Sequence, residues 1–301
     1  MPASPAHIAT WCVCALAIVG VIARPWKLPE ALWAILAAIA LVIFSLISLA
    51  DAGKAVLKGT DVYLFLIGMM VLAELARHEG LFDWLAAFAV RQSKGSYARL
   101  FVLVYLVGTV VTIFLSNDAT AVVLTPAVYA AAQQAKAKPL PLLFICAFIA
   151  NAASFVLPIS NPANLVVYGS HLPSLNVWLA EFGLASIFSI LVTFVVLRFT
   201  QRADLIGSIS RDIRLPVLAR GGRVAAAGIA VTAVVLLIAS SLDRQLGLPT
   251  FLAGLTTAAA ILILNRLSPW AIAKDISWSV LPLVAGLFVL VHVQPSHSLV
   301  G

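Results

Sequence analysis

Charged residues are scarce in this sequence. Asp, Glu, Lys and Arg make up only 10% of its 301 residues, against roughly 25% in soluble domains. Hydrophobic residues make up 62% of the chain and raise its mean hydropathy to +1.08. This composition excludes a soluble globular protein and predicts an all-α polytopic membrane protein. Apolar tracts long enough to cross a bilayer lie at about 7–23, 31–49, 61–76, 139–170, 174–198, 223–242, 249–265 and 278–292.

Cysteine is also scarce, and the usual signatures of enzymes are missing. Cys12, Cys14 and Cys146 all lie inside apolar tracts, so we expect small packing residues and not a disulfide framework. There is no zinc-type Cys/His spacing, no Gly-rich phosphate loop and no Ser/His/Asp set. We therefore expect no enzymatic activity, no metal site and no cofactor. Any energy coupling must come from an ion gradient or from a partner subunit.

The distribution of basic residues predicts the topology. The chain has 19 Lys and Arg but only 12 Asp and Glu, and the basic residues fall in short loops, which indicates orientation in a lipid bilayer and not nucleic-acid binding. If 97–135 is a re-entrant hairpin, sixteen of the nineteen lie on one side of the membrane. That side is then cytoplasmic. The sequence therefore predicts a multi-pass protein of the cell (inner) membrane, with its N-terminus on the outer side. If 97–135 crossed the membrane only once, the loops after it would change sides. The basic residues would then no longer be concentrated on one side.

The predicted hairpin tip carries polar residues that are unusual at membrane depth. Ser116, Asn117, Asp118 and Thr120 interrupt an apolar tract, and Asp118 is the one carboxylate in 97–135. Such a charge is costly unless it faces a cavity or a partner, so it tends to mark a substrate or ion pathway. Asp118 is therefore a candidate proton carrier. The alternative is an N-cap for the returning half-helix.

A second polar interruption lies within 139–170. Two prolines four residues apart must break this helix, and freed carbonyls and a half-helix N-terminus can then face a ligand. Asn161 and Asn164, three apart on one helical face, are the favoured contacts. The alternative is a proline kink whose polar residues only satisfy the backbone. The segment contains Asn151, Ser154, Pro158, Ser160, Asn161, Pro162 and Asn164.

The chain also resembles itself. Leu28-Pro29 recurs as Leu248-Pro249 at an offset of 220, and Gly68 recurs as Gly286 at an offset of 218. If the first unit crosses the membrane five times, the second unit has the opposite orientation in the membrane. Inverted repeats of this kind are common in secondary transporters. We expect a first repeat at 1–202, with its hairpin at 97–135 and broken helix at 139–170. A cytoplasmic basic loop at 203–222, an incomplete second repeat at 223–292 and an aberrant tail at 293–301 follow, as in a truncated or frame-shifted product.

Two further polar features complete the set of predictions. The segment 78–95 is typical of an amphipathic interfacial helix leading into the hairpin. Glu74 is a candidate second proton site, but its position near Arg77 favours an interfacial ion pair.

The polar segments together resemble a known family. The run 114–126, Phe-Leu-Ser-Asn-Asp-Ala-Thr-Ala-Val-Val-Leu-Thr-Pro, followed by Asn-Ala-Ala-Ser at 151–154 and Ser-Asn-Pro-Ala-Asn at 160–164, is similar to the ArsB-type arsenite efflux permeases of the ion transporter superfamily. In this resemblance Asn117 and Asp118 match the hairpin-tip motif, and Ser160 and Asn161 match the helix break. Other members can carry Asp where this chain has Asn151.

The resemblance implies a function and leaves alternatives. It implies export of arsenite and antimonite, as neutral trihydroxides, in exchange for protons, with optional pairing to a cytosolic ATPase subunit. The alternatives are a sodium/proton antiporter or dicarboxylate carrier of the same superfamily, or a non-transporting truncated remnant. Asp118 argues against an anionic substrate, which would favour an uncharged tip.

Overall fold

The computed structural model describes residues 5–168, 172–210 and 215–293. It is 79% helical, and the described residues form no strand. Four helices are long and apolar enough to cross a membrane: α6 (Tyr97–Phe114), α10 (Leu175–Thr200), α11 (Arg220–Ser241) and α12 (Gly247–Asn265). A fifth span results if α3 (Leu49–Lys58) and α4 (Thr60–His78), separated only by Gly59, act together. The prediction of an all-α polytopic membrane protein is confirmed.

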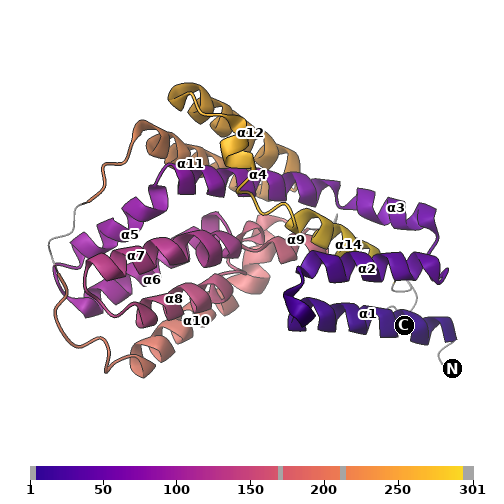
Figure 1. Ribbon diagram of the computed structural model, residues 1–301, viewed down its shortest axis with the longest axis horizontal. Coiled ribbons are helices and arrows are strands. Elements are labelled where there is room, and N and C mark those ends of the chain that lie inside the picture. Colours follow the sequence, from indigo (N-terminus) through magenta and orange to yellow (C-terminus); the bar gives the residue numbers. More distant parts are fainter. Residues whose placement is uncertain (1–4, 169–171, 211–214, 294–301) are drawn as a thin grey trace. The chain divides into compact units, whose positions relative to one another are not determined.

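The chain divides into two compact units, of which the first contains residues up to 63 and from 277 onward. Besides α3 it holds α1 (Pro5–Ala23), the 3₁₀ turn η1 (Pro25–Lys27), α2 (Glu30–Ile43) and α14 (Val280–Val293). Helix α2 packs against both α1 and α14, and α14 also packs against α3 (Figure 1). At the α2–α14 contact, a Cβ on Gly286 would lie 2.8 Å from the Ala34 carbonyl carbon. Only a glycine allows this close approach of two apolar helices.

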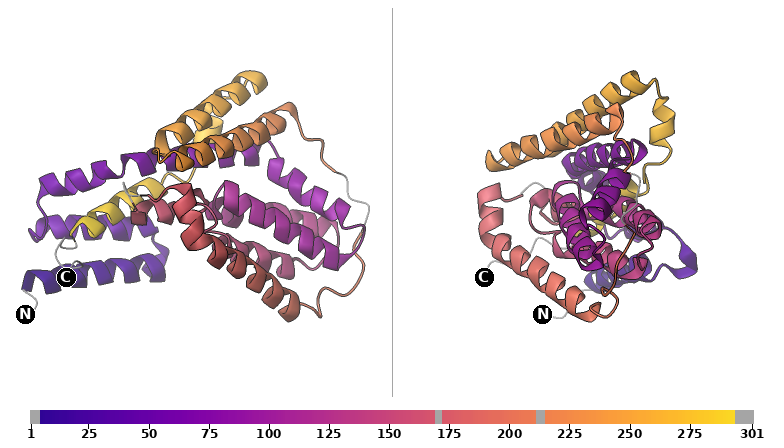
Figure 2. Two further views of the ribbon diagram at one scale, coloured as in Figure 1. Left: turned by 180° about the vertical axis from the view of Figure 1, so that it is seen from behind. Right: turned by 90° about the vertical axis from the view of Figure 1, so that its left-hand side faces the viewer.

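The second unit, residues 64–276, contains both predicted polar segments (Figure 2). Helix α5 packs against α6 and α7, and α7 also packs against α8. Helix α8 also contacts α6 and α10, and α11 packs against α12. The elements not yet given are α5 (Leu81–Gln92), the π-helix η2 (Ala119–Leu124), α7 (Thr125–Gln134), α8 (Pro139–Ala152), η3 (Pro158–Ser160), α9 (Pro162–Tyr168) and α13 (Pro269–Ala273).

Most helices match the apolar tracts, but one predicted span is wrong. The span at 31–49 ends at Ile43, and the separate helix α3 follows a turn in which Ser45 has a φ of 54°. The Ser48 hydroxyl accepts a hydrogen bond from the Asp51 amide at 3.0 Å and so caps α3. This short amphipathic helix carries the charged residues Asp51, Lys54 and Lys58, so its composition is like that of a loop.

Smaller differences concern the other predicted segments. The amphipathic helix expected at 78–95 is α5, whose apolar face is buried. The loop expected at 203–222 ends earlier, because α11 begins at Arg220. Its residues 211–214 and the predicted tail beyond Val293 lie outside the described residues, as do the last residues of the segment 139–170.

The helix contacts follow the spacing of the predicted repeat. Within the second unit, α4 meets α12 where a Cβ on Gly254 would lie 2.8 Å from the Gly68 carbonyl oxygen. Within the first unit, Gly286 meets Ala34. Gly286 is 218 residues after Gly68, and Gly254 is 220 residues after Ala34. The Ala34–Gly286 contact and the Gly68–Gly254 contact therefore join equivalent positions of the two predicted repeats. The domain boundaries themselves stay a prediction.

Candidate substrate site

The chain reverses direction where the hairpin tip was predicted. The hydroxyls of Thr112 in α6 and Thr120 in η2 are 2.8 Å apart, although eight residues separate them. In a continuous helix eight residues would rise about 12 Å. Leu115 and Ser116 therefore form a tight turn that joins α6 to the returning arm, in which residues 117–118 are already helical and η2 and α7 follow.

Ser116, and not Asp118, caps the returning arm. The Ala119 amide donates to the Ser116 hydroxyl at 3.2 Å, whereas the Asp118 side chain makes no capping hydrogen bond. The alternative interpretation of Asp118 as an N-cap is therefore wrong. Within the described ranges the Asp118 carboxylate has no hydrogen bond or ion pair, and its side chain is exposed. The neighbouring Asn117 has a buried Oδ1 with no partner among the described residues.

The returning arm starts at Asn117 and continues after Asp118 as a π-helix. Such helices are rare overall and are often found at functional sites. It covers Ala119–Leu124, and the Thr125 hydroxyl donates to the Thr120 carbonyl at 3.0 Å, five residues back. Pro126 follows and has no amide hydrogen to donate. Thr120 is buried and its hydroxyl bonds to Thr112, so this predicted site residue holds the two hairpin arms together.

The second polar segment is a broken helix that contacts the hairpin. Helix α8 ends at Ala152, and α9 begins only at Pro162. Between them the buried Ser160 hydroxyl donates to the Ile113 carbonyl in α6 at 3.0 Å and accepts from the Leu157 amide at 3.1 Å. The structure therefore brings the break beside the end of α6, four residues before Asn117.

The carbonyl groups freed by the break are largely occupied by side chains. The buried Asn164 amide donates to the carbonyls of Ser154 and Pro158 at 3.0 and 3.3 Å. The Ser154 hydroxyl donates to the Asn151 carbonyl at 2.7 Å. Asn164 was expected to face a ligand. Its amide satisfies backbone groups that the prolines leave without partners, and its contact with a ligand stays a prediction.

The two other asparagines of the segment differ from Asn164. Asn161 precedes α9, and its Oδ1 accepts from the Ala163 amide at 2.9 Å, so the expected shared helical face with Asn164 does not exist. Asn151 is exposed at the end of α8, with its amide on the Ala147 carbonyl at 3.2 Å.

One residue that supports the break was missed in the sequence. Trp178 of α10 is fully buried, and its indole N–H donates to the Phe155 carbonyl at 2.9 Å. Its ring centre lies 5.4 Å from that of Tyr168 in α9, in an edge-to-face contact, and 4.5 Å from that of Phe182, in a tilted contact. The four-residue spacing of Trp178 and Phe182 was the available signal, since it puts both rings on one face of a helix.

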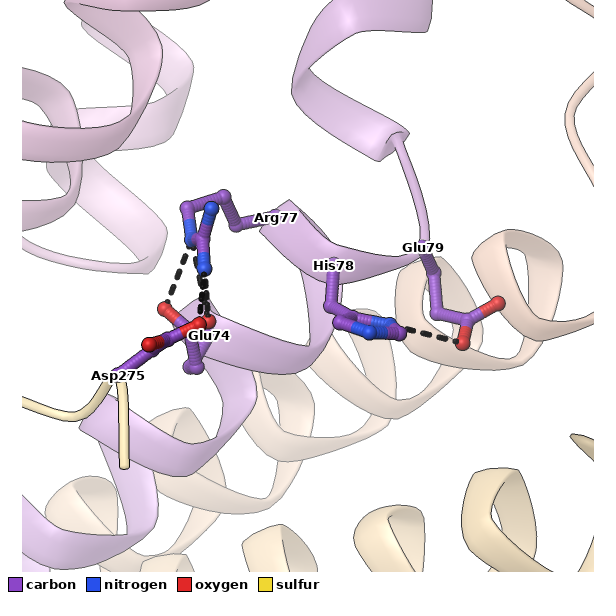
Figure 3. A network of polar contacts seen from close by, with 5 residues as sticks. All are labelled: Glu74, Arg77, His78, Glu79 and Asp275. Carbon is purple, nitrogen blue, oxygen red and sulfur yellow. Dashed lines mark hydrogen bonds and ion pairs between the residues drawn. The ribbon is translucent and has the colours of Figure 1, made fainter. Parts of the chain in front are cut away.

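The charged side chains of a second polar cluster, at the end of α4, pair with one another (Figure 3). Arg77 donates from Nε to Glu74 Oε2 at 2.9 Å and from Nη2 to Asp275 Oδ2 at 3.0 Å. Glu74 is buried, and its pairing with Arg77 confirms the predicted ion pair. Nearby, Glu79 Oε1 accepts from Asn265 Nδ2 at 2.8 Å. Glu74 is therefore a poorer candidate for proton transfer than Asp118.

The hairpin, the broken helix and the apolar spans together define a membrane transporter. The citrate transporter family model matches residues 15–294, so the chain belongs to this family.

Three relatives show the breadth of this similarity. A putative arsenical pump membrane protein of Bacillus subtilis is 34% identical over 146 residues, which are 48% of this chain and 33% of the relative. The arsenical pump membrane protein of Escherichia coli is 28% identical over 46% of this chain and 33% of its own length. An uncharacterized transporter of Synechocystis is 24% identical over 86% of this chain and 59% of its own length.

These matches confirm the resemblance to the ArsB-type permeases of the ion transporter superfamily. They also show that the chain spans between a third and three fifths of the length of these relatives.

Proposed function

We propose that this chain exports arsenite and antimonite from the cell in exchange for protons. The observation that carries the proposal is the Asp118 carboxylate, which has no partner among the described residues and lies at the tip of a hairpin inside the apolar part of a membrane transporter. Intramembrane carboxylates of this kind serve in proton relays. Two relatives that are named as arsenical pumps support the choice of substrate.

The tip offers the groups that a neutral trihydroxide requires. The substrate's hydroxyls can donate to the buried Asn117 Oδ1, which has no partner among the described residues, and to the ionised Asp118 carboxylate. A proton on Asp118 would remove an acceptor that the substrate uses. Proton and metalloid therefore compete at this carboxylate, and such competition is the coupling that an antiporter needs.

In this proposal the side with most Lys and Arg faces the cytoplasm and the N-terminus lies outside the cell. A cytosolic ATPase subunit can pair with that basic side, as the resemblance implies. The competing functions use the same fold differently. A citrate-like anion would be repelled by Asp118, whereas a sodium/proton antiporter would use the same carboxylate without any metalloid.

The test is uptake by everted vesicles that carry the chain and are acid inside. We expect arsenite and antimonite to accumulate, and a protonophore to abolish the accumulation. Parallel arms measure labelled sodium and citrate, and vesicles without the chain give the background. Sodium or citrate flux without metalloid flux would replace the proposed function, and background flux in every arm would favour a non-transporting remnant.

A further inference from the structure

A short segment after α10 closes the base of the hairpin. This basal strap, residues 201–210, donates from the Ile209 amide to the Gly95 carbonyl at 3.0 Å, just before α6. It also donates from the Ser210 amide to the Ala135 carbonyl at 2.8 Å, just after α7. The strap therefore holds the first and last residues of the hairpin side by side, at the end opposite Asp118.

Cations from three segments lie close to the strap, either in sequence or next to residues that the strap contacts. Among the described residues of the strap, the one carboxylate is that of Asp204, which pairs with Lys138 Nζ at 2.6 Å. Within the described ranges, the other cations form no ion pair with a carboxylate. Such a concentration of one sign of charge creates a field that attracts anions. The cations are Lys94, Arg99, Lys136, Lys138, Arg198 and Arg202.

Large apolar side chains are exposed among these cations. Ile206 in the strap is 83% exposed, Phe199 at the end of α10 is 62% exposed, and Leu140 beside Lys138 is 58% exposed. The Arg202 guanidinium lies 4.4 Å from the centre of the Phe199 ring. Exposed apolar groups interleaved with Lys and Arg are typical of surfaces at the boundary between lipid headgroups and acyl chains. A soluble phosphate would not use the apolar groups.

We propose that the basal surface, defined by these six cations and three apolar side chains, binds the phosphate headgroup of an anionic phospholipid. The cations bind the phosphate, while Ile206, Phe199 and Leu140 enter the acyl region. A lipid held here contacts both hairpin ends and the strap, and so stabilises the closed base. This inference is independent of the metalloid, because it concerns the opposite end of the hairpin.

The test is lipid binding by the full chain in a neutral detergent, measured by native mass spectrometry during titration with phosphatidylglycerol or phosphatidylcholine. We expect preferential retention of phosphatidylglycerol. The triple variant Lys94→Gln/Lys136→Gln/Arg202→Gln should lose at least about tenfold in affinity, since each basic residue contributes to attraction by an anionic surface.

A matched control removes the same charge elsewhere, in Lys27→Gln/Lys54→Gln/Lys58→Gln, and should keep the wild-type affinity. The charge-preserving variant Lys94→Arg/Lys136→Arg/Arg202→Lys should also bind normally, which separates charge from folding. Equal retention of the two lipids would overturn the proposal, as would equal loss in both glutamine variants. Displacement of the lipid by millimolar glycerol phosphate would assign a soluble phosphate, and binding of heparin as tight as that of the lipid would assign a soluble polyanion.

Discussion

The hairpin tip and the broken helix are both polar interruptions of apolar helices, but their side chains have different tasks. At the break, Ser154, Ser160 and Asn164 donate to backbone carbonyls, and Trp178 donates to another. At the tip, Ser116 alone caps the returning arm. Among the described residues, the Asn117 Oδ1 has no hydrogen-bond donor and the Asp118 carboxylate makes no capping hydrogen bond.

The difference follows from how much backbone each interruption exposes. The break leaves nine residues between α8 and α9 outside regular α-helix, in surroundings where an unpaired carbonyl costs several kcal/mol. The polar side chains of the break are therefore used to satisfy backbone carbonyls. At the tip only Leu115 and Ser116 lie outside a helix, and the Ser116 hydroxyl caps the returning arm, so the other polar groups remain open for a ligand.

Replacing the Asp118 carboxylate should have the largest effect on transport. In Asp118→Asn we expect proton-driven arsenite uptake to fall to background, because an amide cannot exchange a proton. Thermal stability should not change, since the carboxylate has no partner to lose. Uptake in everted vesicles and unfolding in detergent measure the two quantities.

Asp118→Glu is the matched control, because it retains a titratable group and should retain part of the uptake. Normal proton-driven uptake by Asp118→Asn would remove the carboxylate from the coupling mechanism. A marked loss of stability would show that the tip, like the break, is held by its polar groups.

Both interruptions could be located from the sequence because their signals are local. A carboxylate in an apolar tract and two prolines four residues apart indicate a turn and a break without knowledge of the tertiary structure. Helix boundaries were also accessible where apolar tracts end at charged residues. The exception, α3, shows the limit, since a short charged helix and a loop have the same composition.

Which polar side chains satisfy the backbone and which remain open to a ligand could not be predicted from the sequence. Whether Asn164 faces a ligand or a backbone carbonyl depends on the path of the chain through 153–161. Ser116 caps the returning arm because its hydroxyl reaches the Ala119 amide, whereas Asp118, two residues later, makes no capping hydrogen bond. Trp178 lies far from the break in sequence, so its contact with Phe155 depends on the packing of α10.

Asn164→Leu should have the largest effect on stability. The variant keeps the size of the side chain but leaves the carbonyls of Ser154 and Pro158 without their donor, at a cost of about 1–3 kcal/mol for each buried group. We expect a clearly lower unfolding temperature in detergent, with an unchanged KM for arsenite in protein that stays folded. A raised KM at normal stability would instead make Asn164 a ligand contact.

Ser160→Ala should have an intermediate effect, of about 1 kcal/mol, because it removes the link from the break to the Ile113 carbonyl. Ser154→Ala is the matched control, since its hydroxyl bonds only within the break. If the link positions the tip, Ser160→Ala lowers the rate of arsenite uptake and Ser154→Ala does not, at similar losses of stability. Equal rates in the two variants would mean that the break does not support the tip.

Asn117→Leu should have the smallest effect on stability, and one of opposite sign to that of Asn164→Leu. The Asn117 Oδ1 is buried without a partner, so an apolar replacement removes a desolvation cost and stabilises the protein by up to about 1 kcal/mol. The same change removes an acceptor for the metalloid hydroxyls and should raise the KM for arsenite. Unfolding temperature and uptake kinetics are measured on both leucine variants side by side. A gain in stability with a loss of affinity is expected only where a polar group is held open for a ligand, and a fall in unfolding temperature as large as that of Asn164→Leu would mean that the tip and the break do not differ.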